Sequence, residues 1–105
     1  MSRLTMYVLN PDHTFRATGD VDAWGRAMEG HRHVAMTRFP NGYRVSTVFL
    51  GIDHAFDGGP PVLFETMIFP EPPNGEYQER FATWADAEDG HKVACAKAAA
   101  LPEVE

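Results

Sequence analysis

The sequence predicts an α+β fold, in which one short N-terminal helix and one C-terminal helix pack on an antiparallel sheet of about four to five strands. In the middle of the chain, runs of β-branched and aromatic residues alternate with Asn, Gly and Pro, as expected for strands joined by turns. On each side of these runs, a segment repeats apolar residues at helical spacing. At 105 residues, the chain is predicted to form a single domain over residues 1–105.

The N-terminal third predicts two short strands followed by a helix. Residues 5–9 are rich in β-forming side chains and lead into a turn composition at residues 10–12. Residues 13–18 then return as the second strand. We expect Asp20 to cap a helix that ends at Gly30.

A hairpin follows the first helix. The strands at residues 33–39 and 43–50 flank the turn sequence Pro-Asn-Gly, in which Asn-Gly favours the positive φ angles of a two-residue loop. Such a loop would pair Pro40 with Tyr43.

The next strand is predicted at residues 62–69, after a loop that ends in Gly-Gly-Pro-Pro. In the simplest antiparallel register, Leu50 lies beside Val62. Glu65 is then opposite Thr47.

Side-chain alternation sorts these three strands into two faces. The face expected to receive the helices consists of Ala35, Thr37, Ser46, Val48, Leu50, Val62, Phe64, Thr66 and Ile68. The other face consists of Val34, Met36, Arg38, Val45, Thr47, Phe49, Leu63, Glu65, Met67 and Phe69. This second face is too apolar to remain in water, so we expect a further layer or a homo-oligomer to cover it. The predicted interface residues are Phe49, Leu63, Met67 and Phe69.

The C-terminal part predicts an edge strand and a helix. Residues 76–82 form the expected strand, and Thr83 caps the helix. Its inner stripe is Trp84, Ala87, His91, Ala94, Ala98 and Leu101. Gly90 interrupts the helix at a cost of about 1 kcal/mol relative to alanine, so we interpret it as a point of close packing.

Composition restricts the partners. The formal charge of −6 argues against a nucleic-acid backbone as the main partner, because phosphate binding needs clustered Lys and Arg. Acidic residues gather between residues 71 and 89, which we interpret as a solvated surface, with docking on a basic protein as the alternative. The single cysteine, Cys95, fits a reducing, cytoplasmic location. No apolar run reaches the length of a signal peptide or membrane span, so no membrane partner is expected.

Glu65 is the most informative residue, because it lies among apolar residues on both sides and must find a partner if it is buried. An ion pair with Arg38 is the structural expectation. The functional alternative is a pocket for a small, nucleotide-like anion, in which an arginine meets the anion and Phe49 or Phe69 stacks on a base. The predicted ligand-binding residues are Arg38, Arg44, Thr47, Asp53, His54, Glu65 and His91.

The histidines raise the question of a metal site, but none has the spacing of a zinc motif. The best ligand set, for a metal-dependent hydrolase, is Asp53, His54, Glu65 and His91. The alternative is that His91 is a half-buried helix residue and that Asp53 shapes its loop. The sequence contains no nucleophile elbow or phosphate-binding loop, so we assign no catalytic residue, cofactor or resident metal.

Three blocks of the sequence, STVFLGIDH at 46–54, PVLFETMIF at 61–69 and TWADAEDGH at 83–91, resemble the signature of an uncharacterised family of short bacteriophage, prophage and actinobacterial proteins. This resemblance implies a mobile-element accessory protein and assigns no activity or site residue. By analogy, small acidic proteins of this kind bind a host defence enzyme, a regulator or a signalling nucleotide.

Our leading prediction is therefore a non-enzymatic accessory protein that binds a host or phage protein, with inhibition of a host defence factor as its expected role. The alternative is a protein that binds or sequesters a small anionic ligand. A metal-dependent hydrolase is the third hypothesis.

Overall fold

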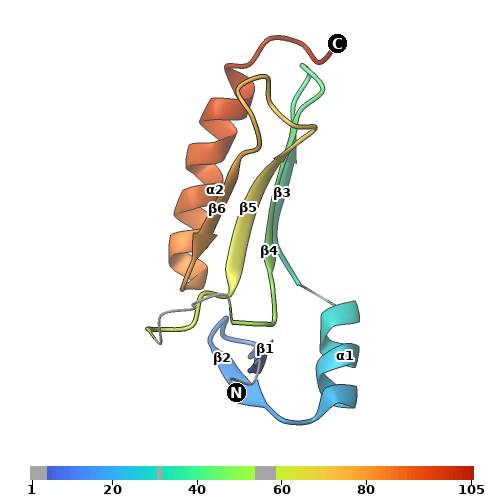
Figure 1. Ribbon diagram of the computed structural model, residues 1–105, viewed down its shortest axis with the longest axis vertical. Coiled ribbons are helices and arrows are strands. Elements are labelled where there is room, and N and C mark those ends of the chain that lie inside the picture. The colour runs from blue at the N-terminus through green and yellow to red at the C-terminus, as the bar shows by residue number, and fades with distance from the viewer. Residues whose placement is uncertain (1–4, 31, 54–58) are drawn as a thin grey trace.

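The computed structural model describes residues 5–30, 32–53 and 59–105, which form two antiparallel sheets and two helices (Figure 1). The larger sheet has the strand order β3-β4-β5-β6, with bounds His33–Arg38, Arg44–Phe49, Phe64–Phe69 and Gln78–Phe81. The smaller sheet pairs β1 (Met6–Leu9) with β2 (Phe15–Thr18). The helices are α1 (Val21–Glu29) and α2 (Trp84–Ala99). The predicted α+β class is confirmed.

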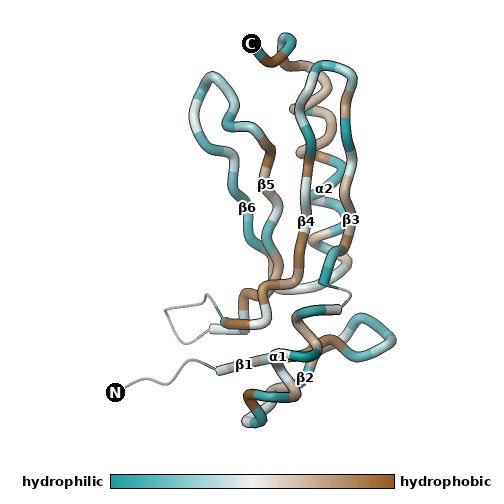
Figure 2. The backbone as a smooth tube through the Cα atoms, turned by 90° about the vertical axis from the view of Figure 1, so that its right-hand side faces the viewer, coloured by the Kyte–Doolittle hydropathy of each residue, from teal (hydrophilic) through white to brown (hydrophobic). Residues whose placement is uncertain are grey.

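Helix α2 covers one face of the four-stranded sheet, and the unit formed by β1, β2 and α1 lies at one end of that sheet (Figure 1). In Figure 2 the sheet stands in front of α2, and no helix or strand of the described chain lies over its opposite face. Helix α1 makes its main contacts with β1. One face of the larger sheet is therefore open.

Both helices begin at the predicted capping residues. The Asp20 carboxylate accepts a hydrogen bond from the backbone N–H of Ala23 at 3.0 Å, and the Thr83 hydroxyl accepts one from the N–H of Asp86 at 3.1 Å. Each bond satisfies a backbone donor that a helix start leaves without an intrahelical partner. Gly30 follows the end of α1, as predicted.

The turn between β3 and β4 has three residues, so the predicted pairing of Pro40 with Tyr43 was wrong. The N–H of Phe39 donates to the carbonyl of Tyr43 at 2.9 Å. Gly42 has a φ of +96°, which suits the last position of a three-residue hairpin loop. Compared with the prediction, β4 is shifted by one residue along β3 between Ala35 and Arg38. A register irregularity between His33 and Ala35 adds a second shift, so that His33 pairs with Val48.

The side chain of Asn41 accounts for this longer turn. Its amide donates to the carbonyl oxygens of Ala98 and Leu101 at 2.8 and 3.0 Å, and its side-chain oxygen accepts from the N–H of Tyr43. These bonds add side-chain donors to backbone carbonyls at the end of α2 and just beyond it. The turn is thereby held to the helix end.

The predicted register between β4 and β5 was also wrong by one residue. The N–H of Leu50 donates to the carbonyl of Leu63 at 2.6 Å, where pairing with Val62 was expected. The N–H of Val62 instead donates to the Asp53 carboxylate at 2.9 Å. Asp53 therefore closes the base of the loop and removes Val62 from the ladder.

These shifts reverse the predicted orientation of β4. Val45, Thr47 and Phe49 are buried and face α2, whereas Ser46 and Val48 lie on the open side. On β5 the predicted alternation holds, with Phe64, Thr66 and Ile68 buried.

The core contains two apolar clusters with a polar layer between them. The cluster near the C-terminal half of α2 consists of Tyr43, Val45, Ile68, Ala94 and Ala98. The cluster near its N-terminal end consists of Phe49, Leu63, Phe64 and Ala87. The polar layer consists of three buried residues whose sequence positions lie between the members of these clusters, namely His91, Thr47 and Thr66.

Gly90 packs against the edge strand. A Cβ atom added there would lie 2.1 Å from Cζ of Phe81, far inside van der Waals contact. The predicted close approach is therefore confirmed.

No helix within the described ranges has both the length and the apolar character needed to cross a membrane.

Candidate functional site

The structure divides the predicted ligand-binding residues among separate places. Thr47 and His91 are buried beneath α2, Asp53 closes a loop, and Arg38, Arg44 and Glu65 belong to the open side of the sheet. His54 lies outside the described residues. Because the sheet separates Thr47 and His91 from the side chains of its open side, the described members of this set do not form one common pocket.

His91 belongs to a buried hydrogen-bond network. Its Nε2 lies 2.9 Å from the Thr37 hydroxyl, and its Nδ1 lies 2.7 Å from the Thr47 hydroxyl. Thr47 is also bonded to Thr66 at 2.6 Å. Burial lowers the pKa of His91, because removal from water disfavours the charged imidazolium. The network joins α2 to three strands, and we assign it to the core.

The predicted metal site is not assembled. Asp53 bonds to Val62, Glu65 bonds to strand β6, and His91 bonds to threonines under α2. Among the described residues, no three His, Cys, Asp or Glu side chains are placed to hold a metal ion. The three described members of this ligand set therefore do not share one metal site, and the fourth, His54, lies outside the described residues.

The open face is the main candidate surface. We use this name for the side chains of the four-stranded sheet that lie on the side away from α2: His33, Met36, Arg38, Arg44, Ser46, Val48, Glu65, Met67, Phe69, Gln78 and Arg80. The two registers place them in adjacent cross-strand rows. Met36 is the most exposed of the large apolar members, at 43%.

Glu65 is paired within the open face. The Nε of Arg80 donates to Oε2 of Glu65 at 3.0 Å, and the side-chain amide of Gln78 donates to the same oxygen at 2.6 Å. The expectation of a partner for Glu65 is thus confirmed, but the predicted partner Arg38 was wrong. In the observed register, β6 places Arg80 directly beside Glu65.

The charge of the open face differs in sign from that of the whole chain. The face carries three arginines and one glutamate, whereas the chain has a net charge of −6. The guanidinium carbon of Arg44 lies 4.8 Å from the centroid of the Phe69 ring, within cation–π range. Arginine and aromatic side chains thus lie side by side on this face.

Two of the four predicted interface residues are on the open face. Met67 and Phe69 are partly exposed there. Phe49 and Leu63 are 2% and 0% exposed and belong to the core, so they are not available to a partner. The register of β4 explains the error for Phe49, because the shift by one residue turns its ring toward α2.

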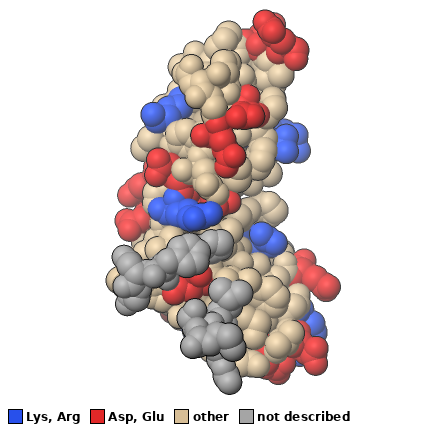
Figure 3. Space-filling view, in the orientation of Figure 1, with Lys and Arg blue, Asp and Glu red and all other residues tan. Residues whose placement is uncertain are grey.

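The acidic residues between β5 and the middle of α2 are exposed, namely Glu71, Glu76, Glu79, Asp86, Glu88 and Asp89. On the side of the molecule shown in Figure 3, acidic side chains occur in several separate groups with basic side chains between them. This distribution fits the interpretation of a solvated surface.

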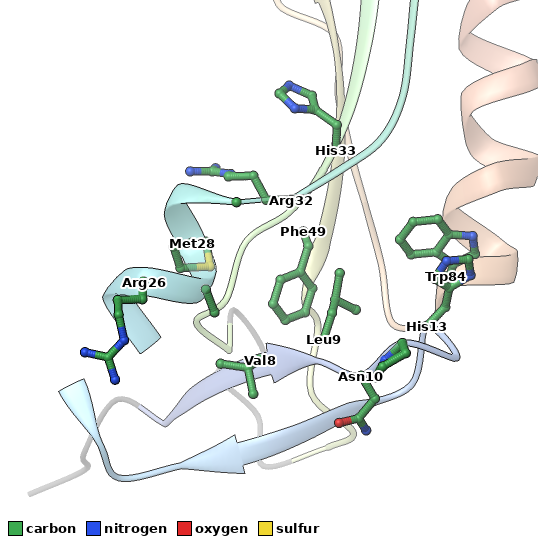
Figure 4. Close-up of a pocket in the computed structure, with 13 residues that line it drawn as sticks. Val8, Leu9, Asn10, His13, Arg26, Met28, Arg32, His33, Phe49 and Trp84 are labelled. Carbon is green, nitrogen blue, oxygen red and sulfur yellow. The ribbon is translucent and has the colours of Figure 1, made fainter. Parts of the chain in front are cut away.

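A cleft of about 580 Å³ lies where the β1-β2-α1 unit meets the end of the four-stranded sheet (Figure 4). Its lining includes Arg32, His13 and Trp84, none of which was predicted to be a site residue. The sequence contains no signal for this cleft, because these residues are far apart in the chain and meet only through the placement of the small unit.

No protein-family model, curated protein or solved structure matches this chain.

Proposed function

We propose that this protein acts by binding another protein, and that its open face docks an acidic segment of that partner. The observation that carries the proposal is the composition of the open face, which combines three arginines with two methionines and one phenylalanine. Arginine, methionine and aromatic residues are enriched in protein interfaces, whereas lysine and acidic residues are depleted. The face contains no lysine, and its single acid is already paired with Arg80.

The charges of the open face define the kind of partner. Arg80 is bonded to Glu65, so Arg38 and Arg44 supply the excess positive charge. They are cross-strand partners at the same end of the sheet. An acidic segment would be attracted to this end while the rest of the acidic protein surface repels it, so the charges would orient the partner.

The apolar part of the open face would then contribute to affinity. Met67 and Phe69 lie on one strand, and Met36 lies across β4 from Met67. These side chains are held by a sheet that α2 supports from behind, so docking would require little ordering of the backbone. The resemblance to phage and prophage proteins supports a host protein as the partner, and inhibition of a defence factor is part of this proposal.

Charge-reversal variants test the proposal. The tagged protein, expressed in its natural host, should capture a specific partner, and Arg38→Glu with Arg44→Glu should abolish that capture. Lys92→Glu with Lys97→Glu makes the same charge change on α2, where both lysines are exposed. The lysine variant serves as the control and should still capture the partner.

The nature of the captured molecule is also decisive. We expect a protein with an acidic segment, resistant to nuclease treatment and released as salt is raised. Loss of capture in the lysine control alone, or nuclease-sensitive capture, would contradict the proposal. Capture of only a second copy of this chain would support the predicted homo-oligomer instead.

A further inference from the structure

We propose that the cleft at the end of the four-stranded sheet is a binding site for a small organic phosphate that carries a flat ring, of the nucleoside monophosphate class. The lining of the cleft contains none of the arginines, methionines or phenylalanines of the open face and meets that face only at His33, and the inference does not rest on the protein-binding proposal. Its volume of about 580 Å³ lies within the range typical of small-molecule sites.

The bottom of the cleft is apolar and firmly held. Val8 and Phe49 are 5% and 2% exposed, and both reach the cleft from strands. Phe49 packs on Phe64 with ring centroids 5.4 Å apart, and Met28 closes the cleft from α1. In Figure 4, Val8 and Phe49 lie between Met28 on the α1 side and Trp84 on the opposite side. Such a surface favours the apolar face of a ligand ring over water.

The polar side chains around the cleft favour an anion. Arg26, Arg32, His13 and His33 line it, and no described carboxylate does so. This set is unusual in a chain with nine basic and fifteen acidic residues. Within the described residues, neither arginine forms an ion pair. Cationic groups without a carboxylate among the lining residues are the expected environment for a phosphate.

Arg32 is the residue on which anion binding depends. It is half-buried, and its backbone carbonyl accepts a hydrogen bond from the N–H of Phe49 at 2.7 Å, which holds its position beside the cleft. In Figure 4 the guanidinium groups of Arg26 and Arg32 both point away from Phe49, on the α1 side, so the phosphate is expected at that outer side of the cleft and not over the Phe49 ring. His33 lies next to Arg32 on the same side.

The opposite side of the cleft offers a stacking surface. The rings of His13 and Trp84 are stacked, with centroids 3.7 Å apart and an interplanar angle of 10°. His13 has a φ of +72°, in the left-handed region that residues other than glycine rarely adopt. The turn supports this conformation through a 3.0 Å hydrogen bond from the His13 N–H to the carbonyl of Asn10. The exposed His13 ring therefore caps Trp84 and offers a flat surface at the cleft.

The two sides of the cleft together define the ligand class. A phosphate at Arg32 and a planar ring against His13 would span the apolar floor between them. Base–aromatic stacking contributes on the order of 1–3 kcal/mol per base, so the ring should add substantially to phosphate binding alone. A free phosphate would use only one side of the cleft.

Calorimetric titration of the full chain tests this inference, with adenosine monophosphate, guanosine monophosphate, adenosine and inorganic phosphate as probes. We expect at least one nucleotide to bind about tenfold more tightly than phosphate or adenosine. Arg32→Gln and His13→Ala should each weaken that binding by about tenfold. Lys92→Gln removes an exposed positive charge from α2 and should leave nucleotide affinity unchanged.

Nuclear magnetic resonance locates the bound nucleotide and provides a second measurement if a variant is unstable. The chain has two tryptophans. The indole N–H of Trp24 donates to the carbonyl of Gly51 at 3.1 Å, and Trp24 is not among the residues lining the cleft. The nucleotide should shift the Trp84 indole signal more than that of Trp24. Absence of nucleotide binding at millimolar concentration, equal binding of phosphate, or affinity unchanged in Arg32→Gln would overturn the inference.

Discussion

Gly90 and His91 are neighbours on α2 that meet the sheet in different ways. Gly90 has no side chain, and this allows the ring of Phe81 to lie against the helix backbone. His91 fills the next position and bonds to the hydroxyls of Thr37 and Thr47. Gly90 thus allows the close approach of α2 to β6, while His91 supplies polar contacts in the layer between the two apolar clusters.

Gly90→Ala should destabilise the protein, although alanine normally favours a helix by about 1 kcal/mol. The added methyl group would collide with the Phe81 ring, and overpacking of this kind costs about 1–3 kcal/mol. Urea unfolding measures the change. Gly25→Ala in α1 is the matched control, because nothing lies within 4 Å of the added Cβ, and it should be neutral or stabilising. Equal effects of the two substitutions would contradict the packing described for Gly90.

The stability of the protein should fall when His91 becomes protonated in the unfolded chain. Burial lowers the folded-state pKa of His91 below its ordinary value of 6.5, so the unfolded state binds a proton first as pH falls. The His91 contribution is therefore complete above pH 6.5 and decreases below it, down to the folded-state pKa.

Unfolding free energies at about pH 7.5 and about pH 5.5 measure this effect. The difference in unfolding free energy between the two pH values should be smaller in His91→Gln than in the wild type. It should persist in His33→Gln, because His33 is exposed on β3. The same pH dependence in wild type and His91→Gln would argue against this role.

At the scale of elements, the sequence predicts where strands and helices lie better than how they pair. Helix caps depend on neighbouring residues, so Asp20, Thr83 and Gly30 could be placed correctly. The strand registers depend on hydrogen bonds between distant residues, from Asn41 to the end of α2 and from Val62 to Asp53. Local composition does not contain that information.

For the candidate site, too, features that depend on neighbouring residues could be predicted, whereas features that depend on strand register could not. That Glu65 needs a partner could be deduced from its apolar neighbours, whereas the choice of Arg80 depended on register. One shifted residue moved Phe49 from the predicted interface into the core. The cleft could not be predicted, because it depends on how the β1-β2-α1 unit meets the sheet.

Asn41→Ala should destabilise the link between the β3-β4 turn and α2. The substitution leaves the carbonyl oxygens of Ala98 and Leu101 without their side-chain donor, which should cost about 1–3 kcal/mol in unfolding free energy. Thermal or urea unfolding measures the loss. Asn74 is exposed in another turn, and Asn74→Ala should change stability by less than about 0.5 kcal/mol. A loss no larger than that of Asn74→Ala would contradict the proposed role of Asn41.

At the scale of the whole molecule, helix α2 and the β1-β2-α1 unit leave two different surfaces available. The helix supports the sheet from one side, which leaves the open face as a flat surface with an excess of arginine. The small unit is joined to the sheet end at Gly51, whose carbonyl accepts from the N–H of Tyr7 at 2.8 Å and from the Trp24 indole. This junction creates the cleft. A protein partner and a small ligand could therefore bind at the same time.

The most direct test of protein binding is site-specific photo-crosslinking in the natural host. A photoreactive residue replaces Met67 on the open face or, as the control, Val93, which is 55% exposed on α2. We expect the Met67 position to crosslink to one acidic protein and the Val93 position to give no such product. Crosslinking of the same protein from Val93 but not from Met67, or no partner at Met67, would contradict the assignment of the open face as the docking surface.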